Sequence, residues 1–178
     1  MPKLVTSAVW ALKPWPITVQ IGHEQVTIPA LSAADWLSVL MEDPIDLEQV
    51  FPGLADAEDL VDEALFEGQL SLDDLYDIGL DCITAASARP WYVAIRLSQI
   101  AQAGWDNLGG ELALAGVDAS RMPLAQWFDA LHLIILRTMD PKSHTMFHSQ
   151  LEMPPPGVQV DESAMEMSRD QFMGMMSG

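Results

Sequence analysis

The apolar residues of this chain change their spacing at Ser32, and this change constrains the fold more than any other feature of the sequence. Before it, Ile17–Ile21 and residues 25–28 alternate β-branched and polar side chains around a short loop containing Gly22, a pattern typical of a β-hairpin. From Ser32 to about residue 149, apolar residues recur at helical spacing. The predicted fold is therefore mainly α, an irregular helical bundle with a small N-terminal β-hairpin or sheet.

Two predicted helices begin with residue pairs that cap helix N-termini. Ser32 is followed three residues later by Asp35, and Ser71 is followed in the same way by Asp74. In such a pair the hydroxyl and the carboxylate can bond to backbone amides that the first turn leaves free. A further helix is expected over residues 56–67, where most acidic side chains face outward.

Prolines and glycines divide the rest of the helical part. Pro90 and Pro123 each stand where the first turn of a helix tolerates proline. Pro52-Gly53 is expected to close a short acidic element, and residues 104–107 to form a loop before a short helix over 108–115. The helix after Pro123 has the clearest apolar stripe, formed by Leu124, Trp127, Phe128, Leu131, Ile134, Ile135 and Met139.

The predicted organisation has three parts. Residues 1–31 form the N-terminal β element, in which residues 4–10 are expected to supply an edge strand, and residues 32–153 form the helical domain. Residues 154–178, which begin with three prolines and a glycine, form a disordered, flexible tail rich in Pro and Met. This tail has two interpretations, an end without a role or an adaptable apolar hook, since methionine fits irregular grooves.

The chain is strongly acidic, with a net charge of −18, and the charge is unevenly distributed. Residues 14–88 contain 16 acidic residues and no Lys or Arg. Nucleic acid is excluded as a partner of this surface because it binds through cations, and an anionic membrane would be repelled. A basic protein would be attracted and steered. The alternative interpretation is that the acidic surface only keeps the protein soluble.

Sequence motifs of catalysis and cofactor binding are missing. There is no phosphate-binding loop, no dinucleotide fingerprint and no nucleophile elbow, so neither an enzyme nor a cofactor is predicted. The single cysteine, Cys82, lies in a helical stripe and is expected to be a small buried hydrophobe. No apolar run reaches the roughly 18 residues that cross a bilayer, and no signal peptide is recognisable, so an intracellular protein without a membrane partner is predicted.

His144 and His148 are the one pair with metal-ligand spacing, because residues four apart share a helix face. Thr145 stands where a metalloprotease has its glutamate, and no third ligand is evident, so no metal site is predicted. A metal-dependent enzyme built on these two histidines remains the third hypothesis for the function. His132 is expected at the edge of the core.

Six tryptophans divide into two groups. Trp36, Trp91 and Trp127 lie in helical apolar stripes and are expected to pack in the core. Trp10 and Trp15 flank a proline-rich segment and are candidate partner-binding residues, since tryptophan is enriched at interface hot spots. Core packing is the competing interpretation for both.

Several short motifs between residues 28 and 157 carry a resemblance to a known family. The most telling is ARPWYVAIRL at residues 88–97, where a small residue, Arg, Pro and two aromatics open a helix with a second Arg. Similar motifs follow the same order along the chain: FPGL at 51–54, LSLDDL at 70–75, GVD at 116–118, WFDA at 127–130 and LEMPPPG at 151–157. In these motifs the chain resembles the tail assembly chaperones encoded by long-tailed, siphovirus-type phages of actinobacteria.

The resemblance implies a function in the host cytoplasm. Such a chaperone binds the long, helical, aggregation-prone tape measure protein and keeps it soluble until tail tube subunits polymerise around it. It is then released, which implies that it is absent from the mature virion. Many phages also make a longer form by ribosomal frameshifting. The family has no catalytic residues to transfer.

A client-binding groove is expected beside Trp91, Tyr92 and Ile95, with apolar walls and a charged rim. Arg89 and Arg96 are expected to pair with internal carboxylates. Self-association is a further interaction under this hypothesis. The alternative function is a structural virion component, a tail or connector subunit, whose hairpin adds to a neighbour's sheet.

Overall fold

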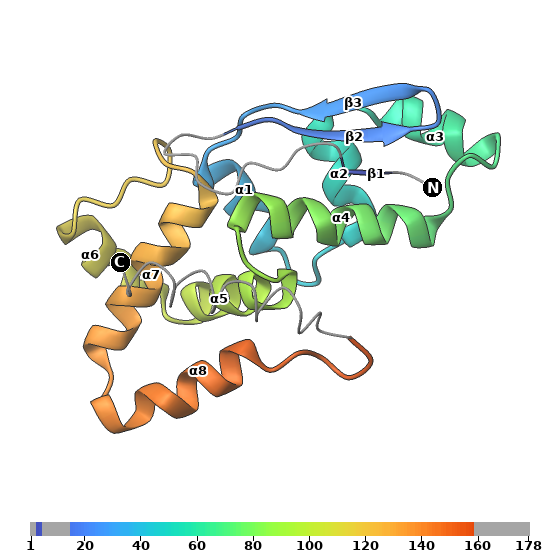
Figure 1. Cartoon of the computed structure of the whole chain (residues 1–178). Helices are drawn as coiled ribbons and strands as arrows, with labels where there is room; N and C mark the ends of the chain where they lie inside the picture. The colour runs from blue at the N-terminus through green and yellow to red at the C-terminus, as the bar shows by residue number, and fades with distance from the viewer. Residues whose placement is uncertain (1–2, 5–14, 159–178) are drawn as a thin grey trace, which may run out of the picture.

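The computed structural model describes residues 3–4 and 15–158 and gives a mainly helical protein with a small antiparallel sheet (Figure 1). The sheet order is β1 (Lys3–Leu4), β2 (Ile17–Ile21) and β3 (Glu24–Ile28). Ile21 pairs with Glu24 across a two-residue turn, so the predicted hairpin is confirmed. The predicted edge strand over 4–10 is confirmed at Leu4, which pairs with Val19.

Two predictions fall outside the described residues. Trp10, with most of the predicted edge strand, belongs to residues 5–14, and most of the predicted tail belongs to residues 159–178. The helical part lies between them. Its elements are α1 (Ala33–Leu40), α2 (Leu47–Ala55), α3 (Glu58–Phe66), α4 (Leu72–Ser87), α5 (Trp91–Ala103), α6 (Trp105–Leu114), α7 (Leu124–Thr138), the 3-10 helix η1 (Pro141–Ser143) and α8 (His144–Glu152).

Both predicted capping boxes are present. At α4, the Asp74 amide donates to Ser71 Oγ at 3.1 Å, and the Ser71 amide donates to Asp74 Oδ2 at 2.9 Å. The pair Ser32 and Asp35 makes the same two bonds at the start of α1. These bonds satisfy amides that have no partner within the helix.

One hydrophobic core connects the sheet with the helices. The inner sheet face contributes Ile17, Val19 and Ile28, which cluster with the buried faces of α4 and α7. α2 crosses α4 so closely that a Cβ on Gly79 would lie 2.3 Å from the Leu47 carbonyl oxygen. A glycine is therefore required at this crossing. Within residues 15–158 no helix combines the length and apolar character of a membrane span.

Two predicted boundaries are wrong. α2 continues through Pro52 to Ala55, because Phe51 and Pro52 are both buried and their packing outweighs the missing backbone hydrogen bond. α6 begins at Trp105, where a loop over 104–107 was predicted, because Gly104 alone ends α5 and starts α6.

Candidate partner-binding surfaces

The predicted α5 residues differ in their accessibility. Tyr92 is only 5% exposed, and its ring meets the Trp91 ring edge-on with centroids 5.6 Å apart. Trp91 and Ile95 are partly buried against the core. The inward face of the helix is formed instead by Val93, Ala94, Leu97, Ser98 and Ala101. Tyr92 is therefore a packing residue that supports Trp91, and only the outer parts of Trp91 and Ile95 are available to a partner.

Arg96 joins α5 to the end of α8. Its guanidinium lies 5.5 Å from the centre of the Tyr92 ring. Its Nη1 donates to the carbonyl oxygens of Gln150 at 3.0 Å and Leu151 at 2.9 Å, and also to that of Met153. The prediction that Arg96 pairs with a carboxylate is wrong, because the free carbonyls at the negative end of α8 supply the acceptors.

An open groove lies between α5 and α8, which run side by side in Figure 1. We call it the α5–α8 groove. Its volume is about 320 Å³, and it begins one residue beyond Ile95, on the side of α5 that faces α8. It is lined by Arg96, Gln99, Ile100, Ala103, Phe147, Gln150 and Leu151. The walls are mostly apolar and the two glutamines provide polar edges, as in grooves that accept an amphipathic helix.

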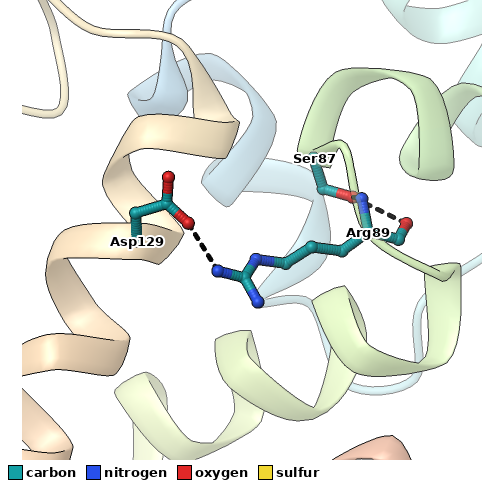
Figure 2. Close-up of polar contacts among 3 residues, drawn as sticks. All are labelled: Ser87, Arg89 and Asp129. Carbon is teal, nitrogen blue, oxygen red and sulfur yellow. Dashed lines mark hydrogen bonds and ion pairs between the residues drawn. The ribbon is translucent and has the colours of Figure 1, made fainter. Parts of the chain in front are cut away.

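Arg89 pairs with a carboxylate, as predicted. Figure 2 shows its guanidinium reaching from the link between α4 and α5 to Asp129 on α7. The backbone of Arg89 is fixed by Ser87, whose hydroxyl donates to the Arg89 carbonyl at 3.1 Å and accepts from the Arg89 amide at 3.3 Å. This arginine therefore holds three elements together and is not free to meet a partner.

Trp15, Trp36 and Trp127 pack in or against the core. Trp36 and Trp127 are buried in the core, as predicted. Trp15 is partly buried and lies with Ile17, Trp36 and Leu124 around a hollow of only about 10 Å³. Trp105, which was not predicted as a site, is 50% exposed at the start of α6.

A second surface surrounds α3, in the part of the chain without cations. On one side, the α2–α4 hollow has a volume of about 160 Å³ and is lined by Glu48, Gln49, Pro52, Glu58, Val61, Asp62, Leu65, Leu72 and Leu75. On the other side, the hairpin hollow has about 250 Å³ and is lined by Ile21, His23, Glu24, Leu60, Glu63, Ala64, Glu67 and Gln69. Each hollow combines apolar side chains with three carboxylates.

Large apolar side chains are exposed around the same helix. Phe66 is 93% exposed, Leu72 55% and Tyr76 42%. Leu72 is the first residue of α4 and lines the α2–α4 hollow. Leu72 and Tyr76 are one turn apart and share a face of α4. The sequence predicted the acidity of this surface but not its exposed apolar residues.

The histidines gather between α7 and α8. The ring centroids of His132 and His148 are 4.9 Å apart, and Nε2 of His132 and of His144 are buried without a hydrogen-bond partner. Burial lowers the pKa of His132, and the positive charges of Arg89 and His148 lower it further. His144 and His148 share a helix, as predicted. Among residues 3–4 and 15–158 no three His, Cys, Asp or Glu side chains are placed to hold a metal ion.

Cys82 is buried in α4, as predicted. Burial raises the pKa of its thiol to about 12, with a further contribution from the charge of Asp81. Because the thiolate is the nucleophilic form, this side chain is unreactive at neutral pH.

Comparison with known proteins adds no relative to these observations. No protein-family model matches the chain, and no curated protein or solved structure is detectably similar to it.

Proposed function

We propose that this chain is a tail assembly chaperone of the kind encoded by long-tailed phages of actinobacteria, and that its client is the tape measure protein. The observation that carries the proposal is the α5–α8 groove, an apolar surface between two helices. A third helix can lie in such a groove and bury its apolar side chains against both walls. The tape measure protein, as the resemblance describes it, presents long helices of this kind.

The groove explains how the client would be kept soluble. Ile100, Phe147 and Leu151 provide the apolar wall, and Gln99 and Gln150 stand at its edges where water remains. An aggregation-prone helix would hide its apolar face there. The acidic part of the chaperone would remain exposed and keep the complex soluble through its charge. We place this activity in the host cytoplasm, with release of the chaperone before the virion is complete.

A structural virion component is the second candidate, and the position of β3 favours it. β3 pairs with β2 on one side only, and within the described residues no strand covers its other side. A neighbouring subunit could add a strand at that edge. Mass spectrometry of purified particles separates the two candidates, because a chaperone is absent from particles and a subunit is present at a fixed ratio.

The proposal is tested by co-expressing the tape measure protein with this chain and measuring how much tape measure protein stays soluble. Ala103→Glu places a charged side chain in the groove at an exposed position, so it can block the client without disturbing the core. Ala113→Glu makes the same change at an exposed position on α6, away from the groove.

We expect the wild-type chain and Ala113→Glu to raise soluble tape measure protein and to co-purify with it. Ala103→Glu should reduce the co-purified amount by about tenfold, because it places a charge within the apolar contact. Precipitation of the tape measure protein with and without the wild-type chain would reject the proposed function.

A further inference from the structure

The α2–α4 hollow has a floor and a rim of different chemistry. Its floor is apolar, formed by Pro52, Val61, Leu65, Leu72 and Leu75 from three helices. Its rim carries the carboxylates of Glu48, Glu58 and Asp62. A long basic side chain has the complementary composition, because Lys and Arg each carry an apolar stem with a charged end.

The rim carboxylates have no cation of their own. None of the three makes an ion pair or a side-chain hydrogen bond within the part of the chain that the structure describes, and residues 14–88 contain no Lys or Arg. Glu48 and Glu58 lie in the first turns of α2 and α3, so the helix dipoles favour their charge. Asp62 lies in the second turn of α3 and is only four residues from Glu58, a repulsive arrangement that a bound cation would relieve.

The apolar floor continues outside the hollow. Leu72 lines the hollow and is 55% exposed, and Tyr76 is 42% exposed one turn further along α4. Phe66, at the end of α3, is 93% exposed. Helix capping explains the acids at helix starts, but it does not explain large apolar side chains left in water beside them.

We propose that the α2–α4 hollow is a docking site for a basic amphipathic helix of a protein partner. In this complex a Lys or Arg stem of the partner lies on Val61, Leu65 and Leu72, and its charged end meets Glu58 and Asp62. Apolar side chains of the same helix cover Tyr76. This inference rests on the proposed function, because it identifies the client segment as basic and places it on a surface separate from the α5–α8 groove.

The site is tested with the full chain and a fluorescein-labelled synthetic peptide that forms a helix with leucines on one face and lysines and arginines beside it. Anisotropy measures its affinity. The matched peptide has glutamates in place of the basic residues. Asp62→Lys reverses one charge of the rim, and Asp106→Lys makes the same reversal at an exposed position on α6. Leu72→Ser removes apolar surface from the hollow without changing any charge.

We expect the basic peptide to bind and the acidic peptide not to bind. Asp62→Lys should weaken binding by about tenfold or more, and Asp106→Lys by about twofold or less. The difference arises because a charge that contacts the peptide acts more strongly on it than a distant, screened charge. Leu72→Ser should weaken binding by about threefold to tenfold through lost apolar burial. Circular dichroism verifies that each variant is folded.

Equal weakening by Asp62→Lys and Asp106→Lys would overturn the inference, because it would reduce the binding to general charge attraction. Failure of the basic peptide to bind at low salt would also overturn it. If the tape measure protein is kept soluble while the peptide does not bind, the inference fails and the proposed function stands. If the peptide binds with the expected variant pattern while the tape measure protein precipitates, the proposed function fails and the docking site stands.

Discussion

Residues 15–88 and residues 89–158 handle charge in opposite ways. The first part has 16 acidic residues and no basic ones, whereas the second has six acidic and five basic residues. In the second part the arginines connect elements, through Arg89 to Asp129, Arg96 to the end of α8, and Arg137 to Glu111. In the first part no ion pair is found, and α2 is held on α4 by close packing at Gly79.

This difference indicates a division of roles. Charges that are paired within the molecule fix the positions of helices, and their attraction is no longer available to a partner. Carboxylates without internal partners contribute little to stability and create a long-range field that attracts basic molecules. The second part therefore builds and holds the α5–α8 groove, and the first part presents an acidic surface. Four predictions test this contrast, beginning with the largest effect.

Gly79→Ala tests whether packing alone holds the acidic part. The new Cβ would lie 2.3 Å from the Leu47 carbonyl oxygen, so α2 and α4 must separate. We expect the free energy of unfolding to fall by about 3 kcal/mol, measured by chemical denaturation. Gly53→Ala is the control, because its added Cβ would meet no atom within 4 Å apart from its chain neighbours and the nearby backbone of α2. The Gly53→Ala change should raise the free energy of unfolding by about 0.5–1 kcal/mol. Equal losses of stability in both variants would contradict the account.

Arg96→Ala tests whether arginine contacts hold the second part. The change removes hydrogen bonds to three backbone carbonyls at the end of α8. A loss of about 2 kcal/mol is expected, with faster amide exchange in α8. Arg121→Ala removes an exposed pair with Asp118 at 3.1 Å and should cost less than about 0.5 kcal/mol. If the amides of α8 exchange as slowly in Arg96→Ala as in the wild type, Arg96 does not hold α8 in place.

His132 should make the stability of the second part depend on pH. Burial lowers its pKa below the ordinary 6.5, as do the nearby charges of Arg89 and His148, while Asp129 and Glu152 act in the opposite direction. The unfolded chain then binds a proton first as pH falls. The contribution of neutral His132 to the free energy of unfolding is fully present above about pH 6.5. It decreases as pH falls from there toward the pKa of His132 in the folded protein. Chemical denaturation at about pH 8 and pH 5.5 measures this effect. The free energy of unfolding should fall less between the two pH values in His132→Phe than in the wild type.

Charge changes on exposed residues should have the smallest effects, with opposite signs in the two parts. Asp62→Lys converts repulsion from Glu58 into attraction and should stabilise by about 0.3–0.5 kcal/mol. Arg137→Glu breaks the pair with Glu111 at 3.2 Å and should destabilise by about 0.5–1 kcal/mol. Both effects should shrink in about 0.5 M NaCl. The same sign for both variants would remove the contrast between the parts.

Features specified by neighbouring residues were predictable from the sequence. The hairpin, both capping boxes and the α7 stripe follow from local patterns, and each is confirmed. The phase of α5 was not predictable, because Trp91 to Ile95 are all apolar and the periodicity does not decide which of them faces inward. The packing of its neighbours buries Tyr92 and leaves Ile95 at the edge.

Features that depend on distant contacts were not predictable. α2 continues through Pro52 because α4 covers it, a tertiary effect that local propensity misses. The α5–α8 groove lies where Arg96 binds backbone carbonyls at the end of α8, and such acceptors have no signature in the sequence. The acidity of the first part was evident from its composition, but the positions of its hollows depend on how α3 packs beside α2, α4 and the hairpin.

Hydrogen–deuterium exchange of this chain, alone and after mixing with the tape measure protein, tests the central claim most directly. We predict slower exchange in two separate places, the peptides covering residues 96–103 and 147–151 of the α5–α8 groove and those covering residues 58–76 around the α2–α4 hollow. In high salt the peptides around the α2–α4 hollow should lose their protection, whereas those of the α5–α8 groove should keep it. No protection on mixing, or protection confined to the β2–β3 hairpin, would contradict the account.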